Sequence, residues 1–256
     1  MKAMILAAGR GERMRHLTDI APKPLLRVGG KPLIVWHIER LAKAGFSEIV
    51  INHAHLGHLL EEILGDGSTW NLSLRYSAEA EALETAGGIA QALTLLGKAP
   101  FLVVNGDIWC DLDFARFAAR GLVGITQGAH AHLALIDNPP HNPNGDFNHV
   151  PVPHSSIGRL TDQPGTRLTF SGVAVYRSEF FAGITPGEKA RLAPLLQSAI
   201  SRSLITGEHF TGRWTDVGTP ARLTELDTEI TAELSTQSTT HNKLVQTVSA
   251  SVPAAR

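Results

Sequence analysis

The sequence predicts an α/β fold: a Rossmann-like, mostly parallel mixed sheet with helices on both faces and an additional small β/α portion. Three observations lead to this prediction. Short apolar runs alternate with segments of helical period as far as Cys110, polar residues follow several of these runs, and 43% of the 256 residues are hydrophobic. A chain of this size and composition can form one large domain around its own core.

The N-terminal half alternates strands and helices. The apolar run at 4–8 predicts a strand. The segment 31–45 predicts a helix, because its apolar residues recur every three or four positions and Gly45 ends it. The same reasoning predicts the other elements of this half, which are strands at 47–52, 72–77 and 100–107 and helices at 55–64 and 87–96. Strands joined by helices run parallel, and ligands then bind beyond their carboxyl ends.

In the C-terminal half the regular alternation of strands and helices is lost. Two further strands are predicted, at 131–137 and 166–176, with a long loop rich in Pro, His and Asn between them at 138–154. Helices are predicted at 193–202 and 221–234. Beyond Leu234 the chain is rich in Ser and Thr and loses its periodicity. We therefore predict one folded domain over 1–232 and a disordered tail over 233–256.

Composition excludes several classes of partner. The chain has 23 basic and 24 acidic residues and a net charge of −1, so no basic stripe for nucleic acid is expected. No stretch approaches the roughly 20 apolar residues of a membrane span, and the short apolar run at the N-terminus is interpreted as a strand rather than a signal peptide. The single cysteine, Cys110, allows no disulfide within the chain and fits a reducing compartment. We expect a cytoplasmic protein that is a monomer or a small homo-oligomer.

The stretch "LAAGRGERMRHLTDIAPKPLL" at 6–26 indicates an anion site. It is not a P-loop, because Gly11 is followed by Glu12 and Arg13, and it is not a dinucleotide fingerprint, because Met14 stands where a third glycine is needed. A Gly-x-Gly turn after a strand lets backbone N–H groups approach a phosphate. Arg13 adds a fork of donors suited to phosphate oxygens. The alternative is an ordinary turn with solvated surface cations.

Lys23 lies in the same stretch between Pro22 and Pro24. Both prolines restrict the backbone, so the lysine projects from a stiff, extended segment. Such a segment suits a polyphosphate that must be held in one place.

Two aspartates suggest a metal site. The apolar strand before "NGD" delivers Asn105 and Asp107 to the sheet edge, and Asp216 stands in "GRWTDVGTP" just before a helix. Carboxylates beside a phosphate loop suit magnesium, Mg²⁺, which prefers oxygen ligands and shares them with phosphates. The alternatives are that Asp107 caps the next segment and that Asp216 is a plain turn residue.

Taken together, the opening stretch, "NGD" and "WTDVGT" resemble the signatures of the sugar-1-phosphate nucleotidylyltransferases. The resemblance covers about residues 1–232. The ordered residues of the opening signature are Gly9-x-Gly11-x-Arg13, Leu17-Thr18 and Pro22-Lys23-Pro24-Leu25. Two positions depart from the family pattern: His16 stands where proline is usual, and Ala86 replaces a glycine of "ETGGGI".

The resemblance implies an activity. In this family an oxygen of a sugar 1-phosphate attacks the α-phosphorus of a nucleoside triphosphate and releases pyrophosphate. Further motifs, among them "LETAGGIAQAL" and "FSGVAVY", imply UTP and N-acetylmuramate α-1-phosphate as substrates, Mg²⁺ as cofactor and a role in bacterial cell-wall (peptidoglycan) recycling. The small β/α portion is then the sugar-binding part. Two alternatives stay open: a nucleotidylyltransferase for glucose or mannose 1-phosphate, and a catalytically silent nucleotide-binding regulatory subunit.

On the nucleotide side, the resemblance implies that Gly11, Glu12 and Arg13 hold the triphosphate and that Lys23 contacts phosphates near the reacting centre. Arg13 and Lys23 are thus the expected catalytic residues. Gly88 is expected to offer its backbone to the nucleotide.

On the acceptor side, the resemblance implies that Asp107 and Asp216 bind Mg²⁺ and that Asn105 and Gly145 contact the sugar phosphate. Cys110 neighbours these residues and is expected only to pack. The histidines of "HAHLGH" lack a matching set of ligands and are expected to be loop and helix-start residues rather than a zinc site.

Overall fold

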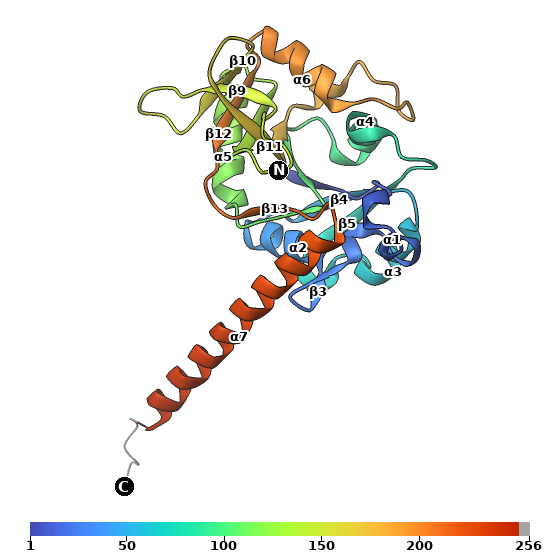
Figure 1. The fold of residues 1–256 in the computed structure, drawn as a ribbon. Coiled ribbons are helices and arrows are strands. Elements are labelled where there is room, and N and C mark those ends of the chain that lie inside the picture. Colours follow the sequence, from blue (N-terminus) through green and yellow to red (C-terminus); the bar gives the residue numbers. More distant parts are fainter. Residues whose placement is uncertain (251–256) are drawn as a thin grey trace.

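The computed structural model describes the backbone of residues 1–250 and the side chains of residues 1–236. One nine-stranded sheet runs through the body in the order β5-β4-β1-β6-β11-β8-β12-β10-β9 (Figure 1). Its strands are β1 (Lys2–Leu6), β4 (Glu48–His53), β5 (Ser73–Ala78), β6 (Phe101–Asn105), β8 (Ala131–Ile136), β9 (Phe147–Val150), β10 (Gly158–Thr161), β11 (Thr166–Tyr176) and β12 (Ile205–His209).

The sheet is mixed, as predicted. Strands β5, β4, β1 and β6 are parallel, β11 is antiparallel to both β6 and β8, and β12 is parallel to β8. The later strands, predicted as an additional portion, therefore extend the same sheet. Two short ladders lie outside it. They pair β2 (Arg27–Val28) with β3 (Lys31–Pro32), and β7 (Ile108–Cys110) with β13 (Trp214–Asp216).

Helices cover both faces of the sheet, which confirms the predicted α/β architecture (Figure 1). The α-helices are α1 (Leu17–Ile20), α2 (Leu33–Lys43), α3 (Gly57–Leu64), α4 (Glu84–Leu96), α5 (Phe114–Thr126), α6 (Leu192–Ser201) and α7 (Pro220–Ala250). Short 3₁₀ helices are η1 (Glu12–Met14), η2 (Lys23–Leu25), η3 (Ser68–Trp70) and η4 (Ser178–Phe181).

Alternation along β1 shows how the two layers form. Ala3 and Ile5 point into a core cluster shared with α2, α3 and α5, whereas Met4 points into the cluster shared with α4 and α6. All three side chains are fully buried. A strand buried on both faces reads as a continuous apolar run, which is why the segment was recognisable.

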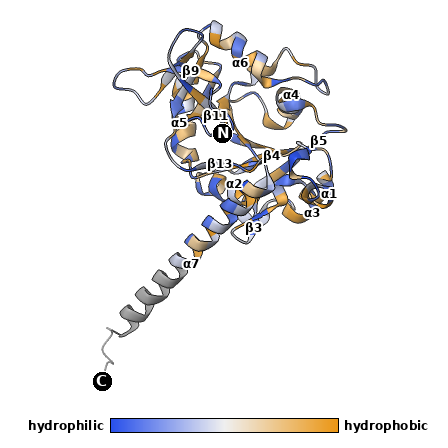
Figure 2. Cartoon of the chain, in the orientation of Figure 1, coloured by the Kyte–Doolittle hydropathy of each residue, from blue (hydrophilic) through white to orange (hydrophobic). Residues whose placement is uncertain are grey.

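Some elements differ from the prediction. Helix α5 was not predicted, because glycines interrupt its sequence. Gly121 lets the helix approach β11, where a Cβ would lie 2.7 Å from Val175. The loop predicted at 138–154 contains β9. Helix α7 continues to Ala250, past Leu234, where the sequence analysis ended it (Figures 1 and 2). Residues 251–256 lie outside the described residues, so the division into a domain and a tail stays a prediction.

Candidate active site

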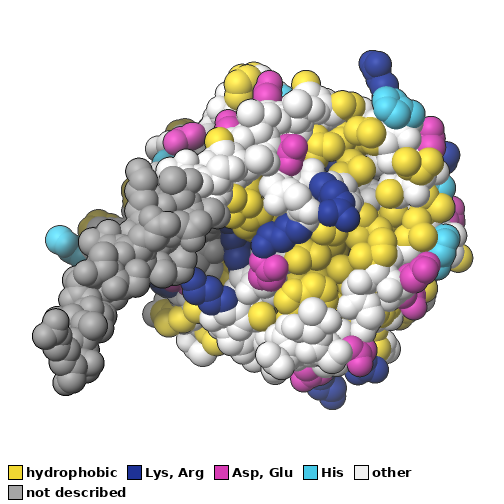
Figure 3. Space-filling view, turned by 90° about the horizontal axis from the view of Figure 1, so that it is seen from below, with side chains coloured by type: hydrophobic (Ala, Val, Ile, Leu, Met, Phe, Trp, Pro, Cys, Tyr) yellow, Lys and Arg dark blue, Asp and Glu magenta, His cyan; other side chains and the backbone are white. Residues whose placement is uncertain are grey.

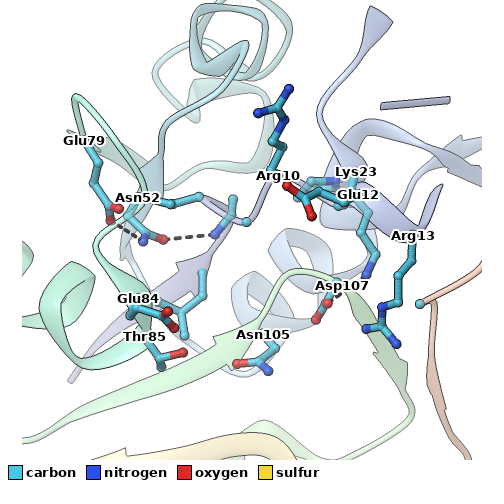
Figure 4. Close-up of a pocket in the computed structure, with 18 residues that line it drawn as sticks. Arg10, Glu12, Arg13, Lys23, Asn52, Glu79, Glu84, Thr85, Asn105 and Asp107 are labelled. Carbon is cyan, nitrogen blue, oxygen red and sulfur yellow. Dashed lines mark hydrogen bonds and ion pairs between the residues drawn. The ribbon is translucent and has the colours of Figure 1, made fainter. Parts of the chain in front are cut away.

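A cavity of about 500 Å³ opens at the carboxyl ends of β1, β4 and β6, the edge at which the sequence predicts ligand binding (Figure 4). Arg10, Arg13 and Lys23 lie on one side of it and the Asn52–Glu79 pair on the other (Figure 4). The residues of the predicted site that line the cavity are Gly11, Glu12, Arg13, Lys23, Asn105 and Asp107.

The turn after β1 is built around Gly11. Its φ of +68° is left-handed, and a Cβ there would lie 3.0 Å from Cγ2 of Thr18 and 3.3 Å from Cβ of Lys23. The Met14 N–H donates to the Gly11 carbonyl at 2.8 Å and closes the turn. Glycine is therefore required here by both conformation and space.

The cations of the site differ in their surroundings. Arg13 is exposed, and its side chain makes no hydrogen bond or ion pair with any described residue. Lys23 is only 5% exposed, and its Nζ lies 2.8 Å from Oδ2 of Asp107. It begins η2, directly after Pro22 in an extended conformation. Pro22 is extended as predicted, but the prediction of an extended segment is wrong for Lys23 itself, which lies in a 3₁₀ helix.

Asp107 follows β6 and Gly106, which makes a tight contact with the end of β1. The Gly106 N–H donates to the Leu6 carbonyl at 2.8 Å, and a Cβ at Gly106 would lie 2.7 Å from the same oxygen. The only partner of the Asp107 carboxylate among the described residues is Lys23. Asp107 is not a helix cap; that role belongs to Asp113, which accepts from the Arg116 N–H at the start of α5.

Asp216 reaches the same region from a distant part of the chain. In the β7–β13 ladder Asp216 pairs with Ile108, and the Val217 N–H donates to the Asp107 carbonyl at 2.9 Å. Oδ2 of Asp216 accepts from Nη1 of Arg222 at 3.0 Å. Asp216 does not line the cavity itself; Gly218, two residues later, does. The ladder thus brings Asp216 opposite Ile108, the residue that follows Asp107.

The far wall of the cavity was not predicted. Asn52 accepts from the Ala7 N–H through Oδ1 at 2.9 Å and donates through Nδ2 to Oε1 of Glu79 at 2.7 Å. The other Glu79 oxygen accepts from the Leu83 N–H at 2.9 Å. The position of Asn52 at a strand end was a signal for this site. Glu79 offered none beyond following β5.

Two predicted binding residues lie outside the cavity lining. Gly88 backs the far wall, where a Cβ would lie 2.6 Å from Oε1 of Glu79. Gly145 has φ +60° in the loop after β8, and its N–H donates to the Asn142 carbonyl at 3.1 Å. The predicted ligand contacts of both glycines stay predictions.

Helix α2 contacts β7, the strand that follows Asp107. The fully buried His37 ring contacts the Ile108 carbonyl through Nε2 at 2.7 Å, and Arg40 contacts the Cys110 carbonyl. Burial lowers the pKa of His37 to about 4 and raises the pKa of Cys110 to about 11. A buried, protonated thiol packs rather than reacts, as predicted for Cys110.

Other classes of site find no support in the part of the chain that the structure describes. No three His, Cys, Asp or Glu side chains there group as metal ligands, and His53 of "HAHLGH" pairs instead with Glu61 at 2.7 Å. No helix among the described residues has the length and apolar character needed to cross a bilayer. On the face seen in Figure 3, a few basic side chains gather near the centre beside an acidic one, and the other charged side chains are scattered around the rim.

Known proteins resemble this chain over most of its length. A family model described as nucleotidyl transferase matches residues 2–233. The chain is 57% identical over 226 residues to a Neisseria meningitidis protein named N-acetylmuramate alpha-1-phosphate uridylyltransferase, across 88% of this chain and 96% of that protein. It is 30% identical to a mannose-1-phosphate guanyltransferase of Schizosaccharomyces pombe, across 86% of this chain but only 61% of that protein.

Solved structures support the fold. A UDP-glucose pyrophosphorylase complexed with UDP-glucose matches with a TM-score of 0.74 and 19% identity, across 91% of this chain and 98% of that one. At this identity the likeness concerns the fold alone.

Proposed function

Since the chain belongs to the nucleotidyl transferase family, we propose that it condenses UTP with N-acetylmuramate α-1-phosphate to give UDP-N-acetylmuramate and pyrophosphate. The observation that carries this proposal is the meeting, in one cavity, of the Gly11 turn, the unpartnered Arg13 and the Lys23–Asp107 pair. The uridylyl group and the muramate sugar are taken from the name of the Neisseria relative, which aligns over nearly its whole length.

In the proposed reaction, a phosphate oxygen of the sugar 1-phosphate attacks the α-phosphorus of UTP, and the bond from that phosphorus to the pyrophosphate oxygen breaks. The attacking oxygen is already anionic at neutral pH, so no protein base has to remove a proton. Catalysis then consists of holding the substrates in line and offsetting their negative charge.

The residues of this chain fit those two tasks. The Gly11 turn admits the triphosphate to the backbone, and Arg13 has all its guanidinium donors available for phosphate oxygens. Lys23 is buried and fixed by Asp107, so its charge stands at a defined point beside the acceptor site. A fixed charge is worth more to the transition state than a mobile one, because no reorganisation is needed.

Asp107 and Asp216 fit a magnesium ion. Asp216 on β13 and Asp107 in the turn before β7 both offer hard oxygen donors, and their side chains are 17% and 39% exposed, so an ion can reach them. Two protein carboxylates suffice, because Mg²⁺ commonly completes its coordination with water and substrate phosphates. When bound, the ion would neutralise negative charge at the reacting phosphorus.

The biological setting is part of the proposal. The cytoplasm supplies UTP, and a UDP-linked muramate sugar is a building block of peptidoglycan. We therefore propose a cytoplasmic enzyme of peptidoglycan recycling.

The test is release of pyrophosphate in the presence of Mg²⁺. UTP and the other triphosphates would each be combined with N-acetylmuramate 1-phosphate, N-acetylglucosamine 1-phosphate and glucose 1-phosphate. Preference for UTP with the muramate sugar is the expected result. Preference for another combination would keep the family and reject the named substrates. Folded protein that binds UTP but turns over no combination would instead indicate the regulatory subunit.

A first prediction concerns Asp107. Asp107→Asn removes the charge that pairs with Lys23 and would bind the ion, so kcat should fall by about 100-fold or more. Asp113→Asn is the matched control, because Asp113 caps α5, does not line the cavity and keeps a capping side chain. Both variants should melt within a few degrees of the unmodified protein. Full activity of folded Asp107→Asn would reject the assigned role.

A further inference from the structure

Arg222 and His141 form a second group of nitrogen-bearing side chains beside Asp216. Nη1 of Arg222, in the first turn of α7, lies 3.1 Å from Nδ1 of His141 and 3.0 Å from Oδ2 of Asp216. Nε2 of His141 lies 3.5 Å from the same carboxylate oxygen. Neither side chain has a role in the reaction proposed above.

Arg222 still has a donor to offer. Its Nη1 serves Asp216 and His141, its Nε lies 3.5 Å from Oγ1 of Thr219, and its Nη2 makes no hydrogen bond to any described residue. That Nη2 lies against Gly218, where a Cβ would be 2.5 Å away. Gly218 lines the cavity, so this guanidinium donor lies next to one residue of the cavity wall.

His141 is held in place rather than free in solvent. Its ring stacks on Trp214 with centroids 6.4 Å apart and planes at 22°. The indole N–H of Trp214 donates to the Ser171 carbonyl at 2.8 Å. The loop that carries His141 is tied to β11, because Nδ2 of Asn142 contacts Oγ1 of Thr169 at 3.1 Å. The two side chains are therefore preorganised for a ligand.

The position of the Arg222–His141 group favours binding of the sugar phosphate over binding of the nucleotide. Its anchor is β13, which pairs with the strand that follows Asp107. The Asn52–Glu79 wall lies across the cavity from Lys23 and Arg13 (Figure 4) and shares no contact with this group. On the acceptor, the group that distinguishes N-acetylmuramate from N-acetylglucosamine is a lactyl ether ending in a carboxylate.

We propose that Arg222, assisted by His141, binds the lactyl carboxylate of N-acetylmuramate 1-phosphate and so selects this sugar over N-acetylglucosamine 1-phosphate. The proposal rests on the proposed function. A guanidinium presents paired donors that match a carboxylate. Asp216 would share its charge with Mg²⁺, which leaves Arg222 able to pair with a second anion.

Two other arginines near Asp216 and the 138–146 loop donate to other partners. Arg213 pairs with Glu229 and Glu233, and Nε of Arg167 donates to the Asn144 carbonyl at 2.7 Å. Arg222 combines an Nη2 with no hydrogen bond to a described residue and a position against Gly218, which lines the cavity.

The test compares Arg222→Gln with the matched control Arg213→Gln. For each, kcat and KM would be measured with both acceptors at saturating UTP and Mg²⁺. The ratio of kcat/KM for muramate to that for glucosamine should fall at least ~10-fold in Arg222→Gln, mainly through KM, and stay unchanged in the control. Arg222→Lys should recover part of the ratio, because it restores the charge without the fork.

Two results would overturn the inference. An equal loss with both acceptors would mean that Arg222 serves the phosphate that both sugars share. An unchanged ratio would mean that the carboxylate is bound elsewhere. The unmodified enzyme separates this test from the proposed function. If it does not use the muramate sugar, the proposed function fails. If it prefers that sugar and Arg222→Gln keeps the preference, only the role of Arg222 fails.

Discussion

Gly11 illustrates how a single residue shapes the phosphate site. Its left-handed φ of +68° is strained for any side chain, and the space for a Cβ is occupied by Thr18 and Lys23. Relieving that contact must move the turn or the lysine, and both face the proposed triphosphate. A change at this residue therefore acts on binding and on stability together.

We expect Gly11→Ala to lower the free energy of unfolding by about 1–2 kcal/mol and to raise KM for UTP by roughly 10-fold. Urea denaturation and steady-state kinetics measure the two effects. Gly183→Ala is the control, since Gly183 has no positive φ and no atom within 4 Å of an added Cβ. A Gly11→Ala enzyme with unchanged KM would show that the turn does not approach the nucleotide.

At the scale of elements, helix α2 holds the strand that follows Asp107. His37 and Arg40, one turn apart on this helix, contact the carbonyls of Ile108 and Cys110. The His37 contact depends on a neutral ring buried in the core, because a second proton would place an uncompensated charge there. The free energy of unfolding is thus coupled to pH through His37.

The sign of that coupling follows from the pKa of His37, which burial lowers from 6.5 to about 4. Between these values the unfolded chain binds a proton that the folded chain does not. Stability is therefore full above pH 6.5 and falls as the pH drops toward 4. His37→Gln keeps an N–H donor for Ile108 but does not titrate. Its free energy of unfolding should drop by about 2 kcal/mol less than that of the unmodified protein between pH 7 and pH 5.

Urea denaturation at a series of pH values measures this difference. The exposed His55→Gln serves as the control and should follow the unmodified protein. Parallel curves for His37→Gln and the unmodified protein would contradict the prediction.

The elements also show what the sequence could and could not predict. Strand β11 was predicted with its observed bounds of 166–176, because a long run rich in apolar and β-branched residues is typical of a strand. Asp107 and Asp216 were each predicted as metal ligands, but the β7–β13 ladder that joins them has no local signal, since pairing between distant segments depends on tertiary contacts. Arg222 was missed for the same reason: one arginine in the first turn of a helix resembles a solvated surface residue.

At the scale of the whole molecule, the first turns of α7 pack against the segment that carries Asp216. Leu226 and Ile230, each 2% exposed, pack with Trp109 and Val217, the residues beside the two aspartates. Oδ1 of Asp227 accepts from the Gly29 N–H at 2.7 Å. The packing of this helix therefore fixes the strand that carries Asp216, and the family match ends close by, at residue 233.

We predict that the part of α7 needed for folding and activity ends by residue 236. Ile230→Ala should lower the free energy of unfolding by about 3 kcal/mol, and Ile230→Val by about 1 kcal/mol, because each leaves a cavity of a different size beneath the helix. A chain that stops after Thr236 should keep kcat and KM for both substrates within about twofold. A tenfold loss of activity in that shortened chain, with its melting temperature unchanged, would assign residues 237–256 a part in catalysis and reject the division at 232.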